Sequence, residues 1–119
     1  MTGPETVGAL VSALNDMDVD AFAGLLSDDV IVEHVPLNRM IEGKQAVIEW
    51  FAAMTELTEA NHVEIRRLCE DGSTIWAERI DRHRIGGQWH EIPIMGVLEL
   101  DGTGKVTLMR DYFDSKLTL

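Results

Sequence analysis

The chain has 119 residues, of which 45% are hydrophobic and 26% are charged, a balance typical of one soluble globular domain and not of a disordered chain. The 10 Lys and Arg against 21 Asp and Glu leave a net charge of −11, which disfavours binding to nucleic acid or to an anionic membrane. Residues 1–5 lack the basic and apolar stretches of a signal peptide, and Cys69 is the single cysteine. We therefore expect a cytoplasmic protein without disulfides.

Apolar spacing predicts three helices in the first half of the chain. Apolar residues recur at three- and four-residue steps over 7–17, which predicts an amphipathic helix with Pro4 in its first turn. Asp18 is suited to cap a second, short helix that presents apolar side chains as far as Leu26. The same spacing recurs over 44–57 and predicts a third helix.

Extended segments account for the rest of the chain. The β-branched residues over 30–34 predict a first strand, which Pro36 ends, and we expect a loop from there to Gly43. Further strands are predicted over 62–69, 74–85, 89–100 and 105–114, with turns at 71–72, 86–87 and 101–104. Helices first and antiparallel strands after predict an α+β fold, in which a twisted sheet can curl around the helices and enclose a cavity.

The turn at Gly86 and Gly87 sets the register of the two strands that it joins, because both glycines suit a two-residue type I′ turn. The expected pairs are Arg82 with Glu91 on one face, and Arg79 with Ile94, Asp81 with Ile92 and His83 with His90 on the other. A four-residue loop at 101–104 then pairs Ile94 with Asp111 on the last strand.

This register gathers charge on a face that also carries apolar side chains. Arg79 and Asp111 flank Ile94, and Asp81 shares their face because it lies two residues from Arg79. Neighbouring strands are about 4.8 Å apart, so one guanidinium can reach both carboxylates, provided that no β-bulge shifts the register. The apolar residues expected on this face are Ile92, Ile94, Leu98, Met109 and Phe113.

The chemistry of this charged cluster depends on where the face points. On the inner face, the two carboxylates would share the guanidinium inside an apolar pocket, since unpartnered buried charges are costly. Carboxyl groups so close do not lose their protons together, which supplies an acid and a base at one pH. On the solvent face, the same residues would form an ordinary ion-pair ladder. The apolar companions favour the inner face.

Three segments carry a resemblance to a known family: 78–81, 94–97 and 110–114, which read ERID, IMGV and RDYFD. Together they resemble the limonene-1,2-epoxide hydrolase family. That family is a branch of the superfamily of nuclear transport factor two, ketosteroid isomerase and the SnoaL polyketide cyclases. The resemblance implies a single domain over 1–119, a cone-shaped, cystatin-like α+β barrel. Its curved, mixed but mostly antiparallel sheet would wrap around the N-terminal helices.

The resemblance also implies a catalytic Asp-Arg-Asp triad. Asp111 would be the general base that takes a proton from water, Asp81 the general acid that protonates the epoxide oxygen, and Arg79 the bridge that orients both. Water would open an apolar epoxide, terpenoid-like or otherwise cyclic, to a vicinal diol in one step, without a metal or an organic cofactor. The residues that would shape the apolar substrate pocket are Ile92, Ile94, Met109 and Phe113.

Three positions depart from the family pattern. Where the family has a tyrosine and an asparagine on the first strand, this chain has Val32 and His34. His34 can still point inward and hold the attacking water, whereas Val32 cannot hydrogen-bond it. A leucine of the family's pocket is His83 here, which makes the pocket more polar.

Two other functions stay open on the same residues. An isomerase or cyclase would use Asp111 or His34 to move a proton beside a carbonyl group. A binding or accessory protein would hold its ligand unchanged, and the loss of the tyrosine at Val32 keeps this option open. His83 and His90 can face each other across a hairpin, but two ligands without a third predict no metal site.

The residues expected on the outer face of the sheet give an indication of the oligomeric state. Its expected apolar residues are Ile80, Met95 and Val97. Exposed apolar surface on a sheet face, together with the family resemblance, favours a homodimer.

Overall fold

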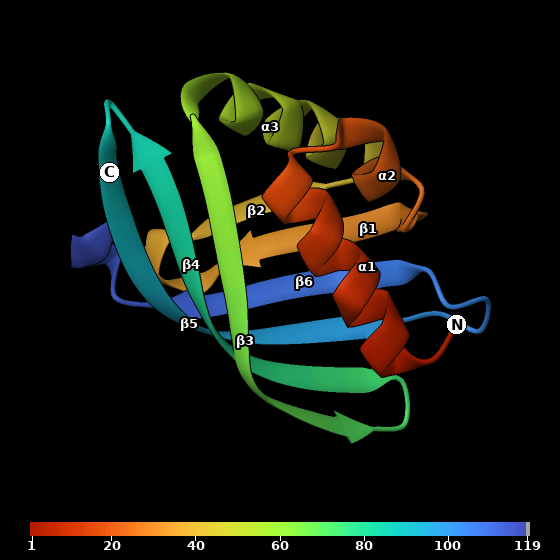
Figure 1. Ribbon diagram of the computed structural model, residues 1–119. Coiled ribbons are helices and arrows are strands. Elements are labelled where there is room, and N and C mark those ends of the chain that lie inside the picture. Colours follow the sequence, from red (N-terminus) through yellow and green to blue (C-terminus); the bar gives the residue numbers. More distant parts are fainter. Residues whose placement is uncertain (119) are drawn as a thin grey trace.

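Three helices lie on the concave side of a curved six-stranded sheet in the computed structural model, which describes residues 1–118 (Figure 1). The helices are α1 (Gly3–Asp16), α2 (Val19–Ala23) and α3 (Lys44–Leu57). The strands are β1 (Leu26–His34), β2 (Arg39–Glu42), β3 (Ala60–Asp71), β4 (Thr74–Ile85), β5 (Gln88–Leu100) and β6 (Val106–Phe113). Single turns of 3-10 helix lie at Val35–Leu37 and Ser115–Leu117.

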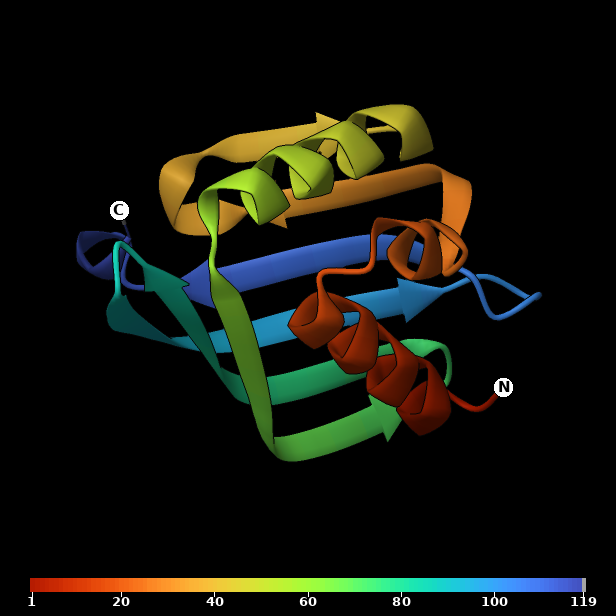
Figure 2. The ribbon, with the colours of Figure 1, turned by 45° about the horizontal axis from the view of Figure 1, so that its top comes forward.

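The sheet has the strand order β2-β1-β6-β5-β4-β3, and it is mixed because β1 runs parallel to β6 while the other pairs are antiparallel. It wraps around the helices without closing, with α3 over β1 and β2 and with α1 over the strands at the other edge (Figure 2). This architecture confirms the expected fold class. Leu119, the last residue of the expected domain, lies outside the described residues.

The first helix begins where its capping residues predict. The Thr2 side chain accepts a hydrogen bond from the Glu5 backbone N–H, and the Glu5 carboxylate accepts one from Thr2, which forms a capping box. Met17 ends α1 in the left-handed conformation. No helix within residues 1–118 is long and apolar enough to cross a bilayer.

The second helix is shorter than expected and the first strand is longer. Asp18 caps α2 as predicted, but the helix ends at Ala23 and Leu26 already belongs to β1. The strand starts four residues early because its pairing with β6 is irregular there, which relaxes the alternation of apolar and polar residues. The Ser27 hydroxyl also donates to Asp29 at 2.8 Å, so the polar segment is satisfied within the strand.

The expected loop between Pro36 and Gly43 contains the short strand β2 instead. It pairs with β1 at the edge of the sheet, through pairs such as Val32 with Ile41. Sequence reasoning missed it because three of its four residues are exposed, so it lacks the apolar alternation of a half-buried strand. The other strands begin and end within two residues of their predicted bounds.

The hydrophobic core fills the space between the helices and the sheet. Phe22, Val30, Val47 and Val106 are fully buried, and the rings of Phe22 and Phe51 lie 4.4 Å apart between centroids. Each such side chain stabilises the fold by about 1.5–3 kcal/mol. This core fixes α2 and α3 against the sheet and so gives the inner face a rigid frame.

The register of β4 and β5 is confirmed, whereas that of β5 and β6 is wrong by two residues. Gly86 and Gly87 have φ values of 59° and 77°, as a type I′ turn requires. Asp111 pairs with Gly96 and not with Ile94 for two reasons. Leu100 pairs with Val106 and not with Lys105, and the pairing shifts by one more residue between Glu99 and Leu100. A shift of two residues keeps every side chain on its expected face.

Candidate active site

One guanidinium on the concave side of the sheet joins two carboxylates. Arg79 and Asp81 come from β4 and Asp111 from β6. The Arg79 Nε donates to Asp81 Oδ1 at 2.8 Å, and Nη2 donates to Asp81 Oδ2 at 3.3 Å. Nη1 and Nη2 donate to Asp111 Oδ1 and Oδ2 at 2.9 and 2.7 Å, a bidentate pair. The geometry brings together the three residues named from the sequence.

The cluster of Arg79, Asp81 and Asp111 is shielded from solvent. The side chains are 15%, 13% and 16% exposed, which rules out a solvent-facing ladder. Burial opposes the charge of Arg79, but the neighbouring carboxylates of Asp111 and Asp81 outweigh it and raise the pKa of Arg79 above its ordinary value. The guanidinium is therefore a permanent cation between the two acids.

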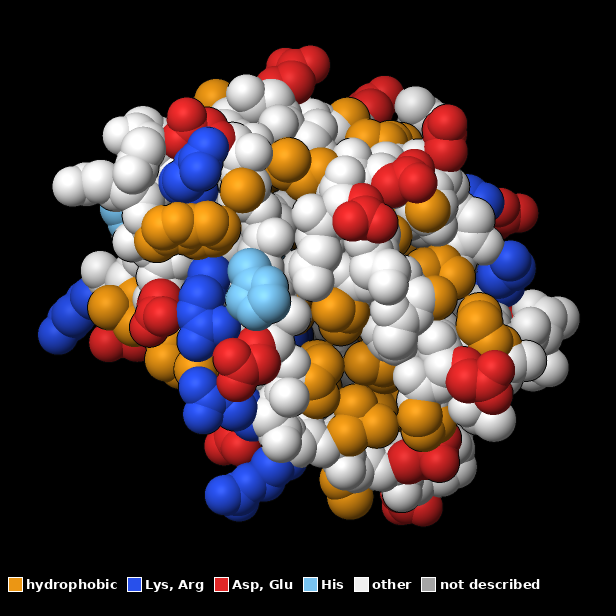
Figure 3. Space-filling model, in the orientation of Figure 1, with side chains coloured by type: hydrophobic (Ala, Val, Ile, Leu, Met, Phe, Trp, Pro, Cys, Tyr) orange, Lys and Arg blue, Asp and Glu red, His pale blue; other side chains and the backbone are white. Residues whose placement is uncertain are grey.

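A hollow of about 50 Å³ lies between α1 and the sheet and reaches Arg79, Gly96 and Asp111. Figure 3 shows apolar side chains gathered around it, beside α1. Its apolar lining comes from α1 (Val7, Leu10, Val11 and Leu14), β3 (Val63 and Ile65), β4 (Ile75 and Ala77), β5 (Val97 and Leu98) and β6 (Met109). The hollow thus joins a charged floor to aliphatic walls, the composition of a small-molecule site.

Only some of the residues expected to form the substrate pocket line this hollow. Met109 lines the hollow, whereas Ile92, Ile94 and Phe113 lie on the same face of the sheet but do not line it. Sequence reasoning missed the α1 wall, since an apolar stripe on a helix looks the same whether it packs in a core or lines a cavity.

His34 lies directly beside Asp111, its register partner across the parallel strands β1 and β6. Its side chain is buried, and its Nδ1 has no hydrogen-bond partner among the described residues. Burial lowers the pKa of His34, against the opposing charge of Asp111, so the imidazole is neutral near pH 7. Its ring centroid lies 5.3 Å from that of Trp50 and 6.1 Å from that of Phe113. Val32 packs in the core, 2% exposed.

His83 belongs to a chain of hydrogen bonds that links the sheet to α1. The Asn61 amide donates through Nδ2 to the Leu14 carbonyl at 3.1 Å, so its Oδ1 is left to accept from His83 Nδ1 at 2.7 Å. Nδ1 therefore carries the proton in the neutral ring. Burial lowers the pKa of His83. A second link runs nearby, where the backbone N–H of Val63 donates to Asn15 Oδ1 at 2.7 Å.

His83 and His90 face each other as register partners, as predicted. Within residues 1–118, however, His, Cys, Asp and Glu nowhere gather in a group of three that could hold a metal ion.

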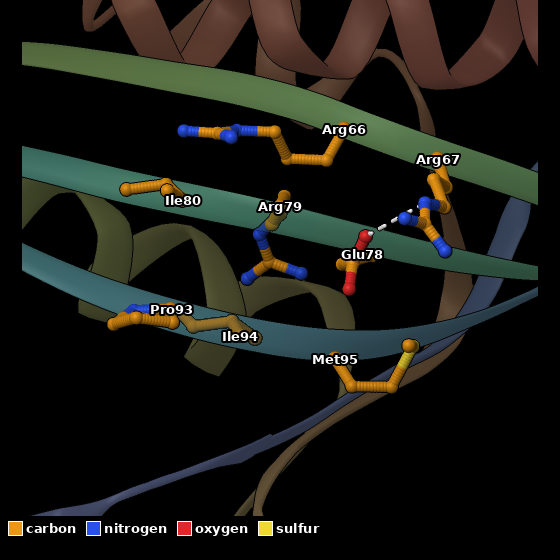
Figure 4. A pocket seen from close by; sticks show the side chains of 8 residues that line it. All are labelled: Arg66, Arg67, Glu78, Arg79, Ile80, Pro93, Ile94 and Met95. Atoms are coloured by element: carbon orange, nitrogen blue, oxygen red, sulfur yellow. Dashed lines mark ion pairs between the residues drawn. The ribbon is translucent and has the colours of Figure 1, made fainter.

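The opposite face of the sheet carries a cleft of about 550 Å³ (Figure 4). The lining residues that alternate to this outer face are Arg66, Arg67, Glu78, Ile80, Pro93 and Met95. Arg79 and Ile94, which belong to the inner face, also border the cleft. Arg67 pairs with Glu78 at 3.5 Å, and both side chains are largely exposed. The cleft is wide and open to solvent, so its ion pair lacks the shielding of the inner cluster.

Known proteins match this sequence and this fold. The family model of the limonene-1,2-epoxide hydrolase catalytic domain matches residues 2–119. The epoxide hydrolase EphG of Mycobacterium tuberculosis is 32% identical over 125 residues, which cover 95% of this chain and 80% of that protein.

Two solved structures extend the comparison to the fold. An LEH-like epoxide hydrolase of Mycobacterium tuberculosis superposes with a TM-score of 0.85 at 32% identity, over 94% of this chain and 82% of that one. A putative SnoaL-like polyketide cyclase of Shewanella denitrificans OS-217 superposes with a TM-score of 0.88 at 15% identity, over 96% of this chain and 91% of that one. The second likeness is one of fold alone.

Proposed function

The chain belongs to the limonene-1,2-epoxide hydrolase family, and we propose that it opens an apolar epoxide, terpenoid-like or otherwise cyclic, to a vicinal diol. The observation that carries this proposal is the shielded contact of one guanidinium with two carboxylates, with Arg79 and Asp111 lining an aliphatic hollow. Epoxide opening needs a base for water and a proton for the leaving oxygen at the same moment, and two acids around one cation supply both.

The proposed reaction is a single step. Asp111 takes a proton from water as the water oxygen bonds to an epoxide carbon. The carbon–oxygen bond of the ring breaks, and Asp81 gives its proton to the epoxide oxygen. Arg79 holds both carboxyl groups in place and stays charged throughout, as its raised pKa requires. Asp111 then carries the proton taken from water and Asp81 is ionised, so the loss of a proton from Asp111 to solvent and the uptake of one by Asp81 reset the site.

We assign the attacking water to the space between His34 and Asp111. The buried, unpartnered Nδ1 of His34 supports this assignment, because a buried polar atom normally has a partner and a water needs at least two. With the hydrogen on Nδ1, the neutral imidazole donates to the water oxygen and does not compete with Asp111 for the water's proton. In this role His34 replaces the polar residues of the family's first strand. Val32 cannot share this role, because its side chain has no hydrogen-bonding group.

Labelled water and one substitution test the proposal together. The parent protein should place oxygen from H₂¹⁸O in one hydroxyl of the diol, across a panel of epoxides from small cyclic to steroid-sized. Asp111→Asn should abolish diol formation while the protein stays folded. A parent protein that leaves every epoxide of the panel intact would refute the assignment.

Two alternatives give different products in the same experiment. An isomerase or cyclase, for which the pairing of His34 with Asp111 would also serve, would incorporate no water oxygen and would exchange a carbon-bound proton. A binding protein would saturate with the epoxide and return it unchanged.

We further propose that the protein is cytoplasmic and forms a homodimer through the outer face of its sheet. The apolar side chains exposed on that face support this, with Trp76, Met95 and Tyr112 being 37%, 43% and 46% exposed, near the partly buried Ile80. Val97, also expected on this face, borders the inner hollow as well. Sedimentation velocity should give twice the chain mass for the parent and the chain mass for Met95→Glu. A monomeric parent would exclude the dimer.

A further inference from the structure

Gly96 stands at the centre of the inner face, where a glycine is unexpected. It lies within β5, buried, between Ala77 of β4 and Asp111 of β6. Its φ is not positive, unlike that of Gly86, so the backbone does not demand a glycine here. Glycine inside a strand costs stability and commonly marks a close approach of another group.

The group that approaches Gly96 is the guanidinium of the cluster. A Cβ built at this position would overlap Arg79 Nη1 and would lie 3.0 Å from Asp111 Oδ1 and 3.6 Å from Arg79 Cζ. Arg79 starts opposite Ile94, and Figure 4 shows its side chain running from β4 toward β5 beside that residue. It must cross the backbone of Gly96 to reach Asp111 on the next strand.

We propose that Gly96 is a positioning residue: because it has no Cβ, it leaves the space that the Arg79 guanidinium occupies. The guanidinium cannot yield to a methyl group by a simple rotation. Its Nε and Nη2 are bound to Asp81 on one side, and Nη1 and Nη2 are bound to Asp111 on the other. A methyl group at 96 therefore displaces Nη1 and opens the bond to Asp111.

The consequence for activity rests on the proposed function. A displaced guanidinium no longer aligns the base with the acid, so kcat should fall about 100-fold, the cost of misplacing reacting groups by about 1 Å. The KM should change little, because the aliphatic walls of the hollow come from other residues. A role in packing alone would not split kcat from KM in this way.

Gly3 offers a control, since a Cβ there would likewise overlap the end of a charged side chain, Glu70 Oε2, and would lie 2.8 Å from Cδ1 of Ile75, a wall residue of the hollow. Gly3 lies at the start of α1 and does not line the hollow. We would compare the parent, Gly96→Ala and Gly3→Ala with cyclohexene oxide as the probe. The Nη signals of Arg79 would be followed by ¹⁵N NMR and assigned by their loss in Arg79→Lys. A bidentate pair fixes the guanidinium, so the parent and Gly3→Ala should give separate Nη signals and Gly96→Ala should not.

A double-mutant cycle with Arg79→Met covers the case in which Gly96→Ala does not fold. The alanine should cost less unfolding free energy in the Arg79→Met background than in the parent, because the overlapping nitrogen is gone. An equal cost in both backgrounds, or separate Arg79 signals retained in Gly96→Ala, would overturn the proposal. If the parent converts no epoxide, the proposed function fails, but the NMR and unfolding measurements still decide the role of Gly96.

Discussion

The two faces of β4 carry the same chemistry in opposite surroundings. Inside, Arg79 holds Asp81 and Asp111 with side chains that are 13–16% exposed. Outside, three residues along the strand, Arg82 holds Glu64 at 3.0 Å and Glu91 at 2.7 Å, but these carboxylates are 39% and 60% exposed. Both clusters join one guanidinium to two acids at similar distances. The difference is the solvent, which screens the outer charges and is excluded from the inner ones.

The largest expected difference between the faces concerns the reaction. Asp111→Asn should lower the rate of diol formation by about 10²- to 10⁴-fold, the usual contribution of a general base. Glu91→Gln removes the corresponding charge from the outer cluster and should leave the rate unchanged. Initial rates for both variants and the parent, with one epoxide at saturation, check this. Equal losses in both variants would mean that the inner cluster has no special role.

Replacing the arginine of the inner cluster should cost more unfolding free energy than replacing that of the outer cluster. Arg79→Met leaves two carboxylates facing each other without their cation, and breaking a buried pair in this way costs about 3–5 kcal/mol. Arg82→Met should cost much less, because water replaces the lost partner. Urea unfolding of both variants at pH 7 measures the two costs. If the two variants unfold at the same urea concentration, the inner cluster is not the more tightly held one.

The inner face should also make stability depend on pH. Burial lowers the pKa of His34 below its ordinary value of 6.5, so the unfolded chain binds a proton that the folded chain excludes. The stabilising effect is complete above pH 6.5 and is lost as the pH falls through the folded-state pKa, with a slope of at most about 1.4 kcal/mol per pH unit. His34→Asn should flatten this slope and the exposed His62→Asn should not. Unfolding free energies between pH 5 and 8 provide the measurement, and His83 adds a slope of the same sign in all variants.

Salt should give the smallest effect. At about 1 M NaCl the screening length is about 3 Å, so exposed pairs lose most of their attraction while shielded pairs keep it. The stability difference between the parent and Arg82→Met should therefore vanish in high salt, and that between the parent and Arg79→Met should persist. Repeating the urea series at low and high salt tests this. If high salt lowers both differences in unfolding free energy equally, the two clusters are equally screened by solvent.

The assignment of β4 side chains to the two faces of the sheet could be predicted, because it depends on short stretches of sequence. The glycine pair at 86–87 sets the β4–β5 register, and alternation then assigns Arg79 and Asp81 to one side. The error at Asp111 arose from two single-residue shifts, the pairing of Leu100 with Val106 and not with Lys105 and the irregularity between Glu99 and Leu100, which has no marker in the sequence. Because the shift was two residues, the face assignment survived it.

The missing features depend on tertiary contacts. The unpartnered Nδ1 of His34 is visible only once Trp50 and Phe113 enclose the ring. The part of α1 in the wall of the hollow likewise depends on how the helix docks, since Leu10 and Leu14 fit a core stripe equally well. Gly96 did have a local signal, a glycine inside a strand, although the group that it accommodates comes from another strand.

The Asn61 and Asn15 links at the end of α1 have one more consequence. They anchor the helix to β3 by polar bonds that involve neither the acids nor Arg79. The attachment of α1 therefore does not depend only on the apolar side chains that it presents to the hollow, while Arg79 and the acids are held on the strands. For the proposed hydrolase, modest changes in the size of these helical side chains should alter which epoxides fit and leave the acids in place.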